Sequence, residues 1–119
     1  MLSKAKAVFV PTTYLEPFGG TNVEAQLSGT PVLTTNFGAF PFTVEHGKTG
    51  FRCDTLNDFV QNAKKVGDLD YNYIRKQAIE KYAMKNVKHQ FNKWFYDLYQ
   101  VFRSATEPNT KGWHYIEKK

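Results

Sequence analysis

The stretch AVFVPTTYLEPFGGTNVEAQLSGTPVLTT, residues 7–35, decides the fold. Its first four residues form a short apolar run closed by a proline, which is typical of a buried strand. A loop with paired glycines follows over residues 14–20, and residues 21–28 have helical character before a glycine and a proline. Residues 32–35 favour a second strand because they are rich in β-branched side chains. Strand, helix and strand in this order predict a parallel sheet.

Downstream, the pattern continues with a short helix over residues 43–45 and a third strand over residues 50–53. From Leu56 onward the apolar residues recur at helical spacing in three stripes. The stripes are Phe59, Ala63 and Val66; Ile74, Ala78, Ile79 and Tyr82; and Val87, Phe91, Trp94, Phe95, Leu98 and Phe102. The fold class is therefore α/β, a partial Rossmann-like unit with a parallel sheet followed by C-terminal helices.

Three strands make a thin sheet, since sheets usually have four to six. We therefore expect the chain to be the C-terminal piece of a larger, truncated α/β domain. Residues 1–104 are expected to form this part of the domain. Residues 105–119 are expected to form a tail, with Trp113 and Tyr115 docking.

Composition bounds the function only loosely. The 119 residues fit one compact domain, and 41% hydrophobic with 23% charged residues is ordinary globular usage. A net charge of +5 permits an anionic partner without choosing among nucleotide, nucleic acid and acidic membrane surface. No apolar run is long enough to span a bilayer, and the N-terminus lacks a signal-peptide core. We expect a cytoplasmic protein, and a peripheral place at a membrane surface is compatible with the charge.

The cysteine and the histidines of the sequence do not indicate a disulfide or a metal site. Cys53 is the single cysteine, so it excludes an internal disulfide and is expected to be a small buried hydrophobic residue. His46, His89 and His114 are not at metal-ligand spacing. We therefore expect no metal site.

The segment most informative about chemistry holds two carboxylates, Glu16 and Glu24, with seven residues between them. Glu16 falls in a loop after a strand's carboxyl end, where open α/β sheets bind ligands, and Glu24 falls in the first turn of the next helix. Gly19 and Gly20 permit close backbone approach, and the N–H groups at the helix start can cradle a phosphate. A loop carboxylate can accept hydrogen bonds from sugar hydroxyls, so one stretch can grip both parts of a nucleotide-sugar.

The same residues also have purely structural interpretations that need no ligand. Thr21-x-x-Glu24 has the spacing of a capping box, which would explain Glu24 without a ligand. Glu16 can be a solvated loop carboxylate, and Gly19 with Gly20 an ordinary turn.

The same segment resembles the C-terminal domain of retaining, GT-B-fold glycosyltransferases of group 1, the glycogen-synthase-like type. These enzymes carry a Glu-x7-Glu motif, E-P-F-G-x-x-x-x-E-A, which residues 16–25 match. A G-x-P-V strand entry follows at residues 29–32, a glycine turn at 38–41 and a G-x-T-G step at 47–50. The resemblance runs from about residue 5 to residue 53 and continues more weakly to about residue 102.

The resemblance implies a transfer of sugar from a nucleoside-diphosphate sugar to an acceptor, with no metal and no cofactor beyond the donor substrate. It implies that Glu16 contacts the donor sugar near the reacting centre and that Glu24 accepts hydrogen bonds from the ribose. The implied backbone contacts to the sugar and the diphosphate come from Phe18, Gly19, Gly20 and Thr21.

Two departures from the family pattern limit this expectation. Phe42 stands where the family usually has a glutamate, and Ala39 replaces the second glycine of the turn. In the family, the basic residues that hold the diphosphate, the base pocket and the acceptor domain lie upstream of this segment. We therefore expect the missing N-terminal domain to be a partner and the chain alone to be inactive.

Two other function classes remain open. One is a non-catalytic interaction module with the same fold. The other is a nucleic-acid binder using the basic, aromatic C-terminal half, although its aromatics fall mostly on the apolar stripe and no nucleic acid is expected. The long stripe over residues 87–102 also predicts a homo-oligomer through the C-terminal helix.

Overall fold

The computed structural model describes residues 2–106. The chain divides into two compact units, Met1–Ala83 and Met84–Lys119, which are described separately. The predicted docking of Trp113 and Tyr115 lies outside the described residues.

The first unit is built on a three-stranded parallel sheet. Its strands are β1 (Val8–Val10), β2 (Val32–Thr35) and β3 (Gly50–Cys53), in the order β1-β2-β3. In the register of the sheet, Leu33 of β2 pairs with Phe9 of β1 and with Phe51 of β3. The predicted α/β class with a parallel sheet and C-terminal helices is confirmed.

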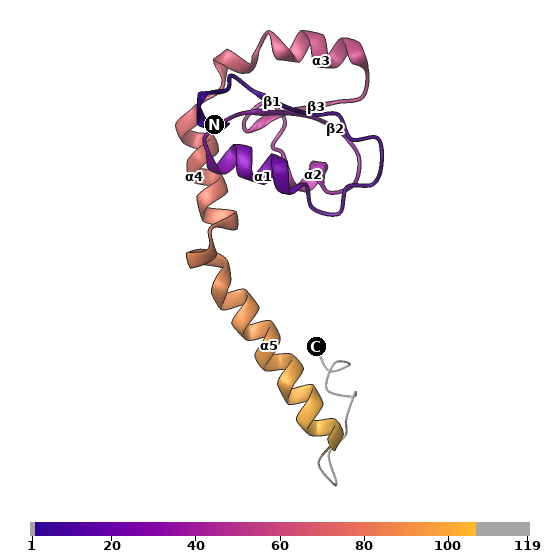
Figure 1. Cartoon of the computed structure of the whole chain (residues 1–119), viewed down its shortest axis with the longest axis vertical. Helices are drawn as coiled ribbons and strands as arrows, with labels where there is room; N and C mark the ends of the chain where they lie inside the picture. Colours follow the sequence, from indigo (N-terminus) through magenta and orange to yellow (C-terminus); the bar gives the residue numbers. More distant parts are fainter. Residues whose placement is uncertain (1, 107–119) are drawn as a thin grey trace. The chain divides into compact units, whose positions relative to one another are not determined.

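Helices cover both faces of this sheet (Figure 1). The helices α1 (Gly20–Leu27) and α2 (Phe40–Thr43) lie on one face, and α3 (Leu56–Ala63) lies on the other. The short helix predicted over residues 43–45 is wrong in position, since α2 ends where it was expected to begin. Pro41 sits in the first turn of α2, where a missing N–H breaks no helical hydrogen bond.

The central strand β2 supplies residues to a core on each side. Val32 packs with Ala25 of α1 and with Val44, while Leu33 packs with Phe51 on the α3 side. All four residues of β2 are buried, as expected for a parallel strand covered on both faces.

The rest of the first unit consists of η1 (Leu2–Lys4), η2 (Val66–Asp68) and α4 (Tyr71–Tyr82). Ile74 and Ala78, two members of the second predicted stripe, are buried residues of α4.

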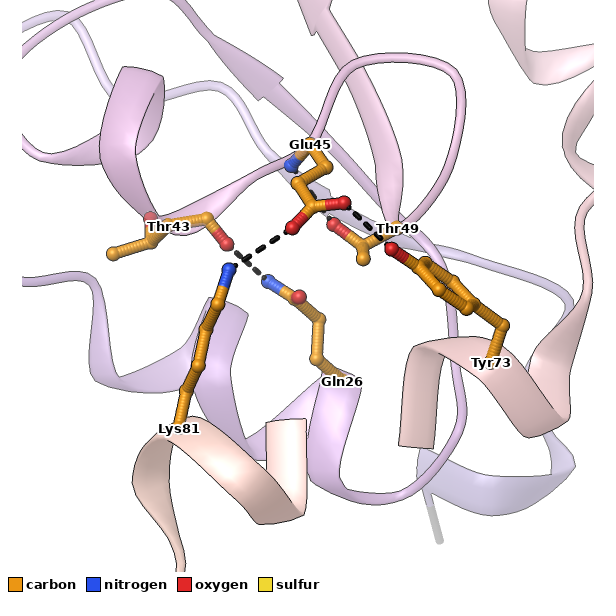
Figure 2. A network of polar contacts seen from close by, with 6 residues as sticks. All are labelled: Gln26, Thr43, Glu45, Thr49, Tyr73 and Lys81. Carbon is orange, nitrogen blue, oxygen red and sulfur yellow. Dashed lines mark hydrogen bonds and ion pairs between the residues drawn. The ribbon is translucent and has the colours of Figure 1, made fainter. Parts of the chain in front are cut away.

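A polar network ties α4 to the connection between α2 and β3, and Figure 2 shows it from close by. The carboxylate of Glu45 accepts a hydrogen bond of 2.8 Å from the hydroxyl of Tyr73 and one of 3.0 Å from the ammonium of Lys81. The backbone N–H of Glu45 donates to the hydroxyl of Thr49 at 3.0 Å. The bonds from Lys81 and Tyr73 hold the pKa of the Glu45 carboxyl below its ordinary value.

The second unit carries α5 (Met84–Thr106). Six of its apolar residues follow alternating steps of three and four, the spacing of a coiled-coil seam. They are Met84, Val87, Phe91, Trp94, Leu98 and Val101. Phe91 and Trp94 are more than half exposed. Within residues 2–106, no helix combines the length and the apolar character that crossing a bilayer requires.

The Glu45 network predicts a pH dependence of folding. Because the folded-state pKa is lowered, its stabilisation is present above the unfolded-state pKa and is lost as the pH falls through the folded-state pKa. Glu45→Gln is expected to lower the free energy of unfolding at pH 7 by about 1 kcal/mol, since the pair is partly exposed. Urea unfolding at a series of pH values measures this.

The same variant is expected to flatten the acid limb of the stability curve. Glu24→Gln makes the same chemical change on an exposed side chain of α1 and is the control, expected within about 0.5 kcal/mol of wild type. An unaltered acid limb in Glu45→Gln would contradict a folding role for the network.

The exposed Phe91 and Trp94 of α5 leave self-association a standing prediction, with a second copy of α5 as the partner. Trp94→Glu puts a charge into the seam and is expected to weaken the dimer by at least about tenfold, because buried aromatic residues dominate such interfaces. Light scattering over a concentration series measures the mass. Tyr96→Glu, an exposed aromatic outside the seam, is the control. A monomeric wild type at every concentration would refute the prediction.

Candidate functional site

The loop between β1 and α1 begins at the carboxyl edge of the sheet and ends at Gly19. This residue is the N-cap of α1 and has a left-handed backbone with φ of 80°. A Cβ on Gly19 would lie 3.0 Å from a ring carbon of Phe40 in α2. Position 19 thus favours glycine for two reasons, the positive φ and the close contact with Phe40. A Cβ on Gly20, in contrast, would meet nothing within 4 Å.

The carboxylate of Glu16 folds back onto its own loop. Its Oε1 accepts a hydrogen bond of 2.9 Å from the backbone N–H of Gly19, and its Oε2 accepts one of 2.8 Å from the hydroxyl of Tyr14. The Tyr14 hydroxyl and the N–H groups of Gly19 and Phe18 lower the pKa of the Glu16 carboxyl, against partial desolvation. Glu16 is therefore an ionised acceptor at neutral pH.

The loop after β2 holds the backbone of Glu16. Gly38 has φ of 61°, and a Cβ there would overlap the backbone nitrogen and oxygen of Glu16. The neighbouring N–H of Ala39 donates to the carbonyl of Glu16 at 2.7 Å. Ala39 has φ of −80°, so alanine fits without strain where the family usually has its second glycine.

A second bond joins the two loops nearer the sheet, since the hydroxyl of Thr35 donates to the carbonyl of Thr12 at 2.5 Å. Parallel strands place both loops at one edge of the sheet, and these bonds fasten them together.

The capping box considered for Glu24 is not formed. Because α1 begins at Gly20 with Gly19 as its N-cap, Thr21 lies inside the helix, and no side chain caps the helix start. Glu24 falls in the second turn, which corrects the expected first-turn position. Its side chain is exposed, and among residues 2–106 its carboxylate has no hydrogen bond or ion pair.

The first turn of α1 is open to an anion. Gly20 and Thr21 are exposed, and no hydrogen bond within the described part of the chain uses their N–H groups. Unpaired N–H groups at a helix start favour negative charge, helped by the helix dipole. The neighbouring Phe18 ring is half exposed and meets Tyr82 edge to face at 6.0 Å.

Three polar residues that sequence reasoning missed anchor this helix. Asn22 and Gln26 are buried on α1, and Nδ2 of Asn22 donates to the Thr43 hydroxyl at 2.8 Å. Gln26 donates to the Asn22 amide oxygen at 2.6 Å and to the Thr43 carbonyl at 2.9 Å. The four-residue spacing of Asn22 and Gln26 on the face of α1 that also carries Ala25 was the available signal.

The other candidate groups lie apart from this site. Cys53 is buried in the α3-side core, which confirms its predicted packing place, and burial raises the pKa of its thiol. Among the described residues, no three His, Cys, Asp or Glu side chains gather as a metal ion would require.

Comparisons with known proteins point to one family. The sequence model of the family described as "Glycosyl transferases group 1" matches residues 1–86. The chain is 29% identical over 99 residues to a sucrose synthase of Melioribacter roseus, covering 83% of the chain and 12% of that protein. It is 46% identical over 65 residues to a D-inositol 3-phosphate glycosyltransferase of Streptomyces scabiei, covering 55% of the chain and 14% of that protein.

A third relative is a capsular polysaccharide biosynthesis glycosyltransferase of Staphylococcus aureus, 35% identical over 85 residues. That match covers 71% of the chain and 22% of the relative. The chain thus spans less than a quarter of each of these relatives.

Two glycines of the site are expected to respond differently to replacement by alanine. Gly38→Ala is expected to lower the free energy of unfolding by about 2 kcal/mol or more, because the Cβ overlaps the backbone of Glu16 at a positive φ. Gly20→Ala has open space and is expected to stay within about 0.5 kcal/mol of wild type. Urea unfolding of the two variants measures this. Equal stabilities would contradict the close approach.

Proposed function

Because the chain belongs to the group 1 glycosyltransferases, we propose that it is the part that holds the sugar donor, a nucleoside-diphosphate sugar. The reaction proposed for the whole enzyme is transfer of the sugar to an acceptor with retention and without a metal ion. The observation that carries the proposal is the open first turn of α1 between two carboxylates, one fixed in the loop and one exposed on the helix.

Each part of the donor has a matching group. The ionised carboxylate of Glu16 accepts hydrogen bonds from the sugar hydroxyls near the reacting centre. Backbone groups of Phe18 and Gly19 face the sugar, while the N–H groups of Gly20 and Thr21 face the diphosphate. Glu24 stands one turn further along α1 and accepts hydrogen bonds from the ribose hydroxyls.

The proposed chemistry is electrostatic. When the bond between the anomeric carbon and the diphosphate oxygen breaks, negative charge accumulates on the diphosphate and positive charge on the sugar ring. The N–H groups of the first turn stabilise the former, and the carboxylate of Glu16 stabilises the latter. Both groups stand in place before reaction, so no reorganisation is needed.

The whole enzyme is proposed to need a second domain. The basic residues for the diphosphate, the base pocket and the acceptor domain are assigned to parts of the enzyme upstream of this segment, so the chain alone is expected to bind donor without turnover. We propose a cytoplasmic setting for this enzyme, and the basic charge suits acceptors at an acidic membrane surface.

Nucleotide binding tests the proposal. Ligand-observed NMR with UDP, GDP and ADP is expected to show that wild type binds one of the three. Glu24→Ala is expected to weaken that binding by about tenfold, the effect of losing hydrogen bonds to a charged group. Glu80→Ala makes the same change of charge in α4 and is the control.

Other results would refute the proposal. Equal binding by wild type and Glu24→Ala would remove Glu24 from the site, and no binding to any of the three nucleotides would favour the interaction module. Oligonucleotide binding that falls steeply with salt and ignores Glu16 and Glu24 would favour the nucleic-acid binder.

A further inference from the structure

The hydroxyl of Tyr14 occupies one oxygen of Glu16, and the Gly19 N–H occupies the other. We propose that Tyr14 is a positioning residue that fixes the plane and the charge of the Glu16 carboxylate for the donor sugar. This inference rests on the proposed function, because it takes Glu16 as the group that meets the sugar.

The need for Tyr14 follows from the freedom of a glutamate side chain. The bond from Gly19 fixes only Oε1, so the carboxylate plane can still turn about the last side-chain bond. A second donor on Oε2 removes that freedom. The terminal oxygens then hold one orientation before a ligand arrives, which lowers the entropy lost on binding.

The chemistry of the donor also matters. A phenol hydroxyl that donates to a carboxylate favours its ionised form. Among the groups that lower the pKa of Glu16, the Tyr14 hydroxyl has the largest effect. Glu16 is thereby kept as an acceptor, the form that a sugar hydroxyl meets by donating.

The count of acceptor positions agrees with this assignment. A carboxylate offers about four lone-pair positions. The Tyr14 hydroxyl and the N–H group of Gly19 use two. About two positions are left for sugar hydroxyls, so the two bonds both present the group and restrict its direction.

The backbone of Glu16 is held independently of Tyr14. Gly38 packs against it, and Ala39 donates to its carbonyl. Tyr14 is itself 62% exposed, so removing its hydroxyl leaves the fold intact. Loss of the hydroxyl therefore changes the presentation of the carboxylate and not the path of the loop.

The chain contains a matched control. Tyr73 donates to Glu45 with the same 2.8 Å length, on a carboxylate that ties α4 to the α2–β3 connection. Tyr73→Phe and Tyr14→Phe delete the same atom from the same kind of bond. Only the second is expected to affect the donor site.

The experiment has two arms on the whole chain. Carbon-detected NMR titration of the glutamate carboxyls is expected to show that Tyr14→Phe raises the pKa of Glu16 and leaves the pKa of Glu45 unchanged. Tyr73→Phe is expected to raise the pKa of Glu45 and to leave that of Glu16 unchanged. Affinities for UDP, GDP and ADP and for UDP-glucose, GDP-mannose and ADP-glucose form the second arm. Tyr14→Phe is expected to lower the affinity for the nucleotide-sugar that wild type binds by about fivefold. The affinity for the corresponding nucleoside diphosphate is expected to stay unchanged.

A double-mutant cycle tests whether Tyr14 acts through Glu16. In a Glu16→Gln background, Tyr14→Phe is expected to have no further effect on nucleotide-sugar affinity. An undiminished effect there, or an unchanged Glu16 pKa in Tyr14→Phe, would overturn the positioning role. Equal affinity of wild type for nucleotide and nucleotide-sugar would overturn the sugar contact, while the titration arm would still report the Tyr14–Glu16 bond. A failure of the proposed function is thus distinguished from a failure of the inference.

Discussion

The close approach of Gly38 to the backbone of Glu16 is the constraint on which the site depends. A side chain on Gly38 would not fit between the two loops, so the backbone of the loop after β2 packs directly against the backbone of the loop after β1. The parallel register of β1 and β2 brings their carboxyl ends to the same edge, and the hydrogen bonds from Ala39 and Thr35 close the gap. The place of the Glu16 carboxylate is thereby set by the sheet.

The buried amides of α1 extend this constraint to the helix. Asn22 and Gln26 bond to one another and to Thr43, so α1 is fixed against α2, which directly follows the Gly38 loop. Apolar packing alone would allow the two helices to shift against one another. The hydrogen bonds of the buried amides are directional, and a shift that broke one would leave a buried polar group unpaired at a cost in free energy. The first turn of α1 and the Glu16 loop are thus held by two independent sets of contacts.

Much of the fold was predictable, because short apolar or β-branched runs next to a proline predict β1 and β2, and β3 lies at the predicted residues 50–53. The errors have physical causes. Pro41 indicated a turn, yet proline is accommodated in a first helical turn, so α2 lies earlier than predicted. The spacing of Thr21 and Glu24 indicated a cap at Thr21, but the N-cap is the left-handed Gly19, two residues earlier. The bond between Tyr14 and Glu16 lies within a loop, where no periodicity reports it.

The arrangement of donors around Glu16 separates two kinds of ligand group. The carboxylate accepts a hydrogen bond from the N–H group of Gly19, while the exposed Gly20 and Thr21 have N–H groups without a partner in the described residues. A carboxylate beside an anion site would ordinarily repel the anion, but the hydrogen bonds from Tyr14 and Gly19 spread the negative charge of Glu16 and reduce this repulsion. Under the proposed function, the step from Gly19 to Gly20 is therefore the boundary between sugar and diphosphate, and it explains why two glycines stand there with different constraints. Gly19 is required by its φ and by Phe40, whereas a Cβ on Gly20 would meet no protein atom within 4 Å, so under the proposed function the missing side chain leaves room for the ligand.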